Sequence, residues 1–416
     1  MIRLILAVLI AWSGAAAAQH AEEGRPPFEL VRPQAGDGPL SVYLRLVEAE
    51  PGLSSSSRSH DWVVQRLAQE AGRLAMHDEA LRWTDQSLAA AAYDSVGVLP
   101  SGVQAVGAVQ EIARRAEAAQ VVMVNEAHHD ASTRLMTRDL LGPLYEQGYR
   151  YLAAETFTSD DVLERRPLYP IPQIGFYIDE PVFGSLVRDA IRLGYTLVRY
   201  EQIEDGPEDD TLSYQQRRDF TQAQNLVDRV LASDRDARIL VHAGYSHVNE
   251  RPGEYFHPMA DYFQGITGID PLTVDQVELG PRSTPAFEHP TYRAALATGL
   301  VANSPVILLD LEGEPLDPSG HEVFTDLQVV RPPTSRPVAT LGYGTLRSFP
   351  LPGACGPCLV EVRRSDEGPD AVPVDRRVAL EGGTVEVMGP RDVPLVVTVL
   401  DGTSPRVLDR RIAVAR

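Results

Sequence analysis

The sequence predicts an α/β protein in which a mostly parallel sheet is flanked by helices, with a helical cap before the sheet and a small β domain after it. The first observation is that short apolar runs alternate with helical patterns between about Pro100 and Leu279, as in parallel sheets. The second is that titratable residues stand where those apolar runs stop. In open α/β sheets that edge binds ligands, so we expect one site there.

The chain begins with a pattern typical of a secretory signal over residues 1–18. Arg3 supplies the positive charge, Leu4 to Trp12 the apolar stretch, and Ala16 to Ala18 the cleavage site. The apolar stretch is too short for a spanning helix, and no later run approaches the length of one. We therefore expect an exported protein, periplasmic or secreted, whose mature chain does not insert into a membrane.

Composition excludes some classes of function. With 416 residues the chain can bury a large core and form more than one domain. Its net charge of -20 argues against binding to nucleic acid, which requires a basic face.

The two cysteines form the sequence Cys355-Gly356-Pro357-Cys358, which equals the thioredoxin redox motif. A redox centre of that kind needs a preceding strand and a following helix. Here Pro350 and Pro352 precede the motif, and the strand-like run Leu359 to Val362 follows it. We expect a structural disulfide rather than a redox or metal centre.

Periodicity divides the chain into regions. Residues 19–100 form an N-terminal helical region after an extended lead-in, residues 101–330 the α/β core, and residues 331–416 a C-terminal β-rich domain. In the core we predict strands at 121–125, 150–154, 196–200, 238–243 and 305–310. Helices are predicted at 103–118, 131–147, 181–193 and 214–232.

The candidate site consists of acids and imidazoles at the ends of these strands. Its members are Glu126, His128, His129, Glu155 and His247. Histidine can exchange a proton near neutral pH, and a neighbouring glutamate can orient its ring or act as a second acid or base. The same residue types could instead hold a divalent metal, and the sequence leaves both chemistries open.

Three neighbouring residues have plainer interpretations. Asp130 precedes Ala131-Ser132-Thr133 and fits a helix cap. Glu201 leads into the acidic run Glu204 to Asp210, so a solvated charge is as good an interpretation as a functional one. His242 directly follows an apolar run and fits a buried histidine that is satisfied by hydrogen bonds.

The motif Asn125-Glu126-Ala127-His128-His129 resembles the Gly-Glu-x-His motif of the erythromycin esterase, ChaN-like and TraB/Tiki-like proteins. Glu155 after Gly148-Tyr149 matches their second acidic motif. Arg218-Asp219 with a later His247-Val248 is similar to the esterase pattern, and the resemblance covers roughly residues 105 to 330. Gly244 replaces the first histidine of the esterase's paired motif, which argues against hydrolysis of a macrolide ring.

The resemblance implies a hydrolase-like site with assigned roles. His128 or His129 would be the general base and Glu126 its partner. Glu155 would share the proton, Arg218 would steady negative charge, and His247 would be a second acid or oxyanion donor. In the Tiki branch the matching positions bind a divalent metal for peptide hydrolysis, and in the ChaN branch the scaffold binds haem and iron.

We therefore expect a hydrolase acting on an ester or amide bond of a small molecule or peptide, with or without a metal. The alternative is a non-catalytic protein that binds haem, iron or another small ligand in the same pocket. A third hypothesis is a pseudoenzyme that serves protein interaction. No Gly-x-Ser-x-Gly elbow and no phosphate-binding glycine motif follows any predicted strand, which disfavours serine and nucleotide chemistry.

Overall fold

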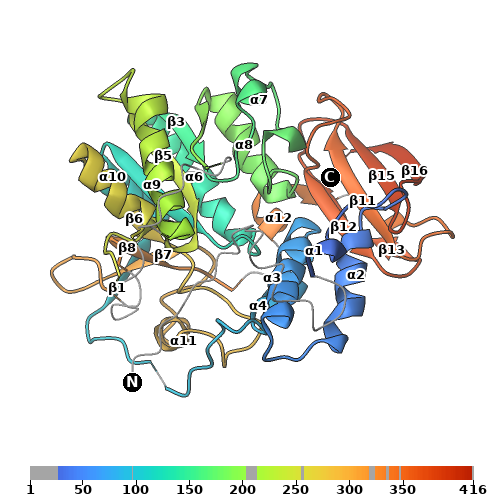
Figure 1. Ribbon diagram of the computed structural model, residues 1–416, viewed down its shortest axis with the longest axis horizontal. Coiled ribbons are helices and arrows are strands. Elements are labelled where there is room, and N and C mark those ends of the chain that lie inside the picture. The colour runs from blue at the N-terminus through green and yellow to red at the C-terminus, as the bar shows by residue number, and fades with distance from the viewer. Residues whose placement is uncertain are drawn as a thin grey trace.

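The computed structural model describes residues 27–95, 97–202, 213–253, 257–317, 324–333, 337–345 and 348–414 (Figure 1). The predicted signal at 1–18 and the acidic run at 204–210 lie outside these residues. Within them, no helix combines the length and the apolar character that crossing a membrane would require.

An eight-stranded sheet forms the centre of the molecule, in the order β1-β7-β8-β6-β2-β5-β3-β4. Strands β8, β6, β2, β5, β3 and β4 run parallel, and β1 and β7 add antiparallel pairs at one edge. The strand bounds are β1 Gln104–Gly107, β2 Val121–Glu126, β3 Tyr149–Ala154, β4 Thr196–Arg199, β5 Arg238–Gly244, β6 Leu272–Asp275, β7 Val306–Leu309 and β8 Leu327–Val330.

Helices cover both faces of this sheet, because its strands are apolar on both sides. One face packs against α5 (Ala108–Ala116), α6 (Ser132–Glu146) and α8 (Pro181–Leu193) in a core that includes Leu140 and Leu186. The other face packs against α9 (Tyr214–Leu226), the π-helical turn η4 (Val227–Leu231) and α10 (Met259–Thr267). Shorter helical elements between the strands are α7 (Asp160–Glu164), η3 (Pro172–Ile174), η5 (Tyr245–Val248) and α11 (Pro290–Ala297).

The N-terminal region is helical, as its periodicity predicts. It contains α1 (Pro27–Leu30), α2 (Ser41–Ala49), η2 (Glu50–Gly52), α3 (Arg58–Arg73) and α4 (His77–Thr84). Ser57 caps α3, since its side chain accepts a hydrogen bond from His60 N at 3.0 Å. Leu46, Val63 and Leu67 share a small apolar core between these helices.

The C-terminal residues form antiparallel strands, as the alternating pattern predicts. The main sheet has the order β12-β11-β15-β16. The elements are α12 (Pro337–Thr340), β9 (Gly344–Thr345), β10 (Phe349–Pro350), β11 (Cys358–Arg364), β12 (Asp375–Ala379), β13 (Thr384–Val385), β14 (Met388–Gly389), β15 (Leu395–Asp401) and β16 (Val407–Ala413). Cys355 and Cys358 form a disulfide beside this sheet. Figure 1 shows the blue N-terminal helices against the orange sheet, where Leu40, Leu74 and Leu359 pack together.

Two predictions about the elements need correction. The helix predicted at 103–118 begins only at Ala108, because Gln104–Gly107 pairs with β7 as an edge strand. The sheet also contains β6 and β8, which were not predicted. Each is short and contains a buried polar residue, Thr273 in β6 and Gln328 in β8, that interrupts its apolar run.

Candidate active site

The carboxyl ends of β2, β5 and β3 bring the candidate residues together. Glu126 ends β2 and stands opposite Gly244, which ends β5. Glu155 follows β3, and its backbone N–H bonds to His242 O at 3.0 Å. The chain reaches β3 and β4 through helices on one face, then returns to β5 and β6 through helices on the other. In open α/β sheets, such a reversal marks the crevice outside the strand ends where ligands usually bind.

Glu126 is a buried carboxylate with three partners. Its Oε1 lies 2.9 Å from His128 Nδ1, and its Oε2 lies 2.6 Å from Arg134 Nε and 3.1 Å from His242 Nε2. Burial would raise the pKa of Glu126, but Arg134 and then His242 outweigh it and hold that pKa well below its ordinary value. Glu126 is therefore ionised and accepts the Nδ1–H of His128.

Arg134 holds this carboxylate in place from α6. Its guanidinium is 1% exposed and also donates to Glu180 Oε2 at 3.1 Å and to the backbone oxygen of His128 at 2.9 Å. Glu180 in turn accepts hydrogen bonds from the first backbone N–H groups of α8. A buried cation shared by two acids fixes both the Glu126 side chain and the turn that carries His128.

His128 presents its second ring nitrogen to the crevice. Its Nε2 lies 3.9 Å from Glu155 Oε1, and its ring stacks on Tyr177 with centroids 4.6 Å apart. Gly244 leaves room for the His128 ring beside Glu155, because a Cβ on residue 244 would come within 2.6 Å of that ring and 2.8 Å of Glu155 Oε2. Because Nδ1–H is bonded to Glu126, the lone pair of Nε2 remains available to take a proton.

Glu155 and Arg218 form the opposite wall. Arg218 NH2 donates to Glu155 Oε1 at 2.6 Å, and Gly244 N donates to the other oxygen. Burial would raise the pKa of Glu155, but Arg218, His247 and His128 lower it to about 2. Glu155 is therefore a carboxylate at neutral pH.

All three nitrogens of Arg218 have partners. Nε bonds to Glu201 Oε1 at 2.9 Å, NH1 lies 3.0 Å from His247 Nε2, and NH2 contacts both Glu155 and Glu201. Glu201 also accepts from Gln222 Nε2 at 3.1 Å. Of the two interpretations that the sequence left open for Glu201, the structure favours the one inside the site.

His247 is fully buried behind Arg218. Its Nδ1 lies 2.5 Å from Asp219 Oδ1, which also accepts from the backbone of Met259 at 3.0 Å. Burial would lower the pKa of His247, but Asp219 and Glu155 outweigh it, and the net effect raises that pKa. The contact of Nε2 with Arg218 is a hydrogen bond only while His247 is neutral.

His129 lies apart from these groups. Its Nδ1 contacts Tyr245 Oη at 3.1 Å, and burial lowers its pKa to about 3. Asp130 accepts from the backbone N of Ser132, the first residue of α6, at 3.0 Å and from Arg331 at 2.6 Å, but the N-cap position of α6 is Ala131 and not Asp130 as predicted. His242 is buried and bonded on both ring nitrogens, to Glu126 and Thr137, as expected for a satisfied core histidine. In the His128-His129 doublet, only His128 contacts both Glu126 and Glu155.

The arrangement does not fit a resident metal ion. Among the described residues, no three His, Cys, Asp or Glu side chains converge as a metal-binding group. The guanidinium of Arg218 already lies between Glu155, Glu201 and His247, where a bound cation would need to sit. The oxygens and nitrogens that could coordinate a metal ion are thus already bonded to the guanidinium of Arg218.

Three functional candidates were not predicted from sequence: Arg134, Asp219 and Tyr177. Asp219 is adjacent to Arg218 in the motif, so its place in the sequence could have identified it as a site residue. Arg134 lies six residues after His128 in the sequence, and Tyr177 lies 22 residues after Glu155. Their contacts depend on tertiary packing that no local pattern records.

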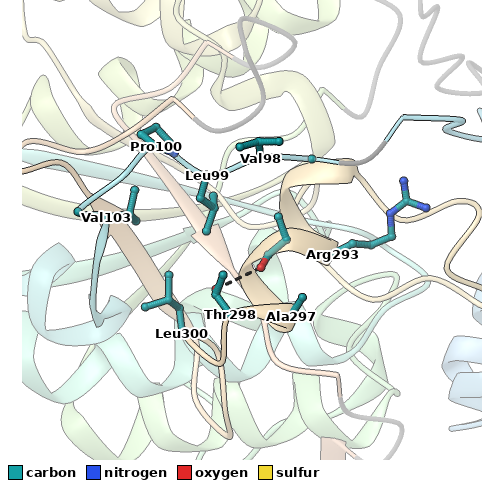
Figure 2. A pocket seen from close by; sticks show the side chains of 11 residues that line it. Val98, Leu99, Pro100, Val103, Arg293, Ala297, Thr298 and Leu300 are labelled. Carbon is teal, nitrogen blue, oxygen red and sulfur yellow. Dashed lines mark hydrogen bonds between the residues drawn. The ribbon is translucent and has the colours of Figure 1, made fainter.

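A separate hollow of about 740 Å³ lies elsewhere, between α11 and the segment that precedes β1. Figure 2 shows its apolar lining, which includes Leu99, Val103 and Leu300. Arg293 is the one charged residue in the described lining. Since no pair of acidic and basic groups lines it, this hollow lacks the chemistry of the strand-end site.

No protein-family model matches the sequence, and no curated protein matches it significantly. Among solved structures, the type III effector HopBA1 is 14% identical over 44% of this chain and 86% of that chain, with a TM-score of 0.29. RRSP, a MARTX toxin effector domain from Vibrio vulnificus, is 15% identical over 56% of this chain and 52% of that chain, with a TM-score of 0.30.

The C-terminal region of Pasteurella multocida toxin, described as having a thiol-protease-like catalytic triad, is 10% identical. That match covers 90% of this chain and 58% of the toxin chain, with a TM-score of 0.33. Likenesses this weak establish neither a shared fold nor a shared function.

Proposed function

We propose that this chain is an exported hydrolase-like enzyme that activates water for attack on an ester or amide bond of a small molecule or peptide. The observation that carries the proposal is the Glu126–His128 pair. A buried carboxylate 2.9 Å from Nδ1 fixes the ring so that Nε2 faces the crevice between the strand ends. A histidine oriented in this way by an acid is the arrangement of a general base.

The geometry accommodates the attacking water. Nε2 of His128 and Oε1 of Glu155 are 3.9 Å apart, so one water oxygen can lie about 2.8 Å from both. His128 takes a proton as the water oxygen bonds to the carbonyl carbon, and the carbonyl electron pair moves onto its oxygen. When the bond to the leaving group breaks, His128 returns the proton to that group.

The other residues hold this geometry. The ionised Glu126 stabilises the charge that His128 gains, as the acid does in other His–acid pairs. Glu155 positions the water and stays ionised because of Arg218. Asp219 and His247 fix Arg218 from behind through the 3.0 Å contact with its NH1.

We also propose that the chain belongs with the erythromycin esterase-like, ChaN-like and TraB/Tiki-like proteins, on the strength of its motifs. The positions that carry the resemblance are joined by hydrogen bonds at the strand ends: Glu126 with His128, and Arg218 with Glu155 and His247. The haem- or iron-binding alternative has no observation in its favour. Neither a metal nor haem enters the steps proposed here.

The test measures hydrolysis of 4-nitrophenyl esters and fluorogenic peptide amides by the purified mature chain. Replacing His128→Asn should lower kcat/KM by roughly 10²–10⁴-fold, the usual contribution of a general base. His257→Asn is the matched control, because the His257 side chain is 40% exposed and its described contacts are with Asp261 and Tyr262 on α10, away from His128. Equal activity of the H128N variant and the wild type would refute the assignment.

A further inference from the structure

The proposed reaction needs a group that donates to the oxygen on which negative charge develops. In acyl transfer that donor is a major part of catalysis. Arg218 is already bonded to Glu201, His247 and Glu155 through Nε, NH1 and NH2, which leaves at most one of its five N–H groups for a substrate. Arg134 is equally committed, to Glu126, Glu180 and the backbone of His128. The hydroxyl of Tyr245 is engaged with His129.

Tyr177 is the remaining donor beside His128. Its ring lies 4.6 Å from the His128 ring at an interplanar angle of 17°. Among the described residues, no side chain or backbone group forms a hydrogen bond with its hydroxyl, whereas the hydroxyl of Tyr200 donates to His242 O at 3.1 Å. A half-buried phenol with an uncommitted proton, stacked on the proposed base, is available to a substrate.

The backbone fixes Tyr177 relative to Glu155. Thr156 follows Glu155 directly, and its Oγ1 accepts from Tyr177 N at 2.8 Å while its carbonyl accepts from Phe176 N at 3.0 Å. Gly175 permits this approach, because a Cβ there would overlap the Thr156 carbonyl. The segment that carries Tyr177 is thus tied to the strand end that carries Glu155.

We infer that Tyr177 is a further catalytic residue of this site, whose hydroxyl donates a hydrogen bond to the carbonyl oxygen of the substrate as that oxygen becomes negative. The inference rests on the proposed hydrolase function. Burial, together with Glu155 and Glu126, raises the pKa of Tyr177, so the phenol keeps its proton at neutral pH. The hydroxyl donates without transferring this proton, and the electron pair gained by the oxygen returns when the leaving group departs.

Access from solvent supports this position. Phe176, next to Tyr177, is 63% exposed, and the two rings lie 6.1 Å apart. The same short segment therefore has one ring at the surface and one against His128.

The experiment compares Tyr177→Phe with the wild type in steady-state hydrolysis of 4-nitrophenyl esters. This change removes one oxygen and keeps the stacked ring. We expect kcat to fall by roughly 10²–10³-fold, with KM changed by less than about threefold. Tyr169→Phe is the matched control, since Tyr169 lies earlier in the same segment and its hydroxyl bonds to Asp370, away from the site. Its kcat should equal that of the wild type.

A second variant and a second measurement separate the outcomes. If Tyr177→Phe is fully active and Tyr177→Leu is not, the ring only supports His128 and the inference is wrong. Binding of a 4-nitrophenyl phosphonate, which carries an anionic tetrahedral centre, should weaken in Y177F by a factor similar to the loss in kcat; unchanged binding overturns the donor role. A wild-type protein without any turnover overturns the proposed function itself, whereas an active wild type with an active Y177F overturns only the role of Tyr177.

Discussion

At the scale of single residues, the absence of a side chain at position 244 governs the site. The backbone of Gly244 has φ -81° and ψ 140°, so alanine fits the backbone without strain. Its Cβ, however, would lie 2.6 Å from His128 Cε1. We expect Gly244→Ala to displace the ring and lower kcat/KM on ester substrates by about 100-fold, as misplacement of a catalytic group does.

Gly265→Ala provides the control for that change. Gly265 lies on the exposed side of α10, where an added Cβ meets nothing within 4 Å. The variant should keep full activity and gain roughly 0.5–1 kcal/mol in the free energy of unfolding, because alanine favours a helix. Full activity of G244A would show that the close approach of His128 and Glu155 is not required.

His247 makes the free energy of unfolding of the protein depend on pH. Its pKa is raised in the folded state, so protonated His247 stabilises the fold below its unfolded pKa, and this contribution is lost as pH rises through the folded pKa. Replacing Asp219→Asn removes the largest group that favours the charged ring. As pH rises from about 5 to about 8, the free energy of unfolding measured with urea should fall less in D219N than in the wild type. An unchanged fall would contradict the assignment.

Among residues, those at strand ends were predictable. Glu126, Glu155 and His247 follow apolar runs, and parallel strands place their carboxyl ends at one edge. The choice of His128 over its neighbour was not predictable, because adjacent residues point in different directions and the packing decides which one meets Glu126. Tyr177 could not be predicted for a related reason, since its position depends on a loop that is bonded to Thr156.

At the scale of elements, helix-end signals and uninterrupted apolar runs decided which elements the sequence predicted. The helix predicted at 181–193 coincides with α8, whose ends are marked by Pro181 and by Gly194 in a left-handed conformation. β2 and β5, with six and seven residues, were long enough to be seen as apolar runs. In β6 and β8 the buried polar residues Thr273 and Gln328 interrupt the apolar run, and these strands form through pairing with their neighbours.

Helix α3 supports the site from the N-terminal side, because Gly72 near its end packs against the backbone of His129. Removing its cap through Ser57→Ala should cost about 1 kcal/mol in the free energy of unfolding. Ser56→Ala is the control, since Ser56 is exposed and contacts only Ser54. Chemical denaturation measures both, and equal stability of the two variants would show that the cap is not needed.

At the scale of the whole molecule, charged residues of the N-terminal helices, the central α/β region and the C-terminal sheet are bonded to one another. Arg376 on β12 pairs with Glu361 on β11 at 2.8 Å and donates to the backbone oxygen of Arg73 at the end of α3, 2.7 Å away. Arg73 also pairs with Asp179 at 3.1 Å, and Asp179 precedes the Glu180 that holds Arg134. The N-terminal helices, the central sheet and the C-terminal sheet are thus joined next to the site.

Arg376→Ala should uncouple these regions. Arg376 is 5% exposed, and the loss of one partner of a buried ion pair costs roughly 3–5 kcal/mol because the other charge stays buried. Since Arg376 connects the C-terminal sheet to α3, we expect calorimetry to show one thermal transition for the wild type and two for R376A. Arg411→Ala, which removes an exposed partner of Asp409 on β16, should leave the transition unchanged. A single, unshifted transition in R376A would mean that other contacts, such as the packing of Leu40 and Leu74 against Leu359 and the bonds from Arg188 to Glu367, couple the regions without Arg376.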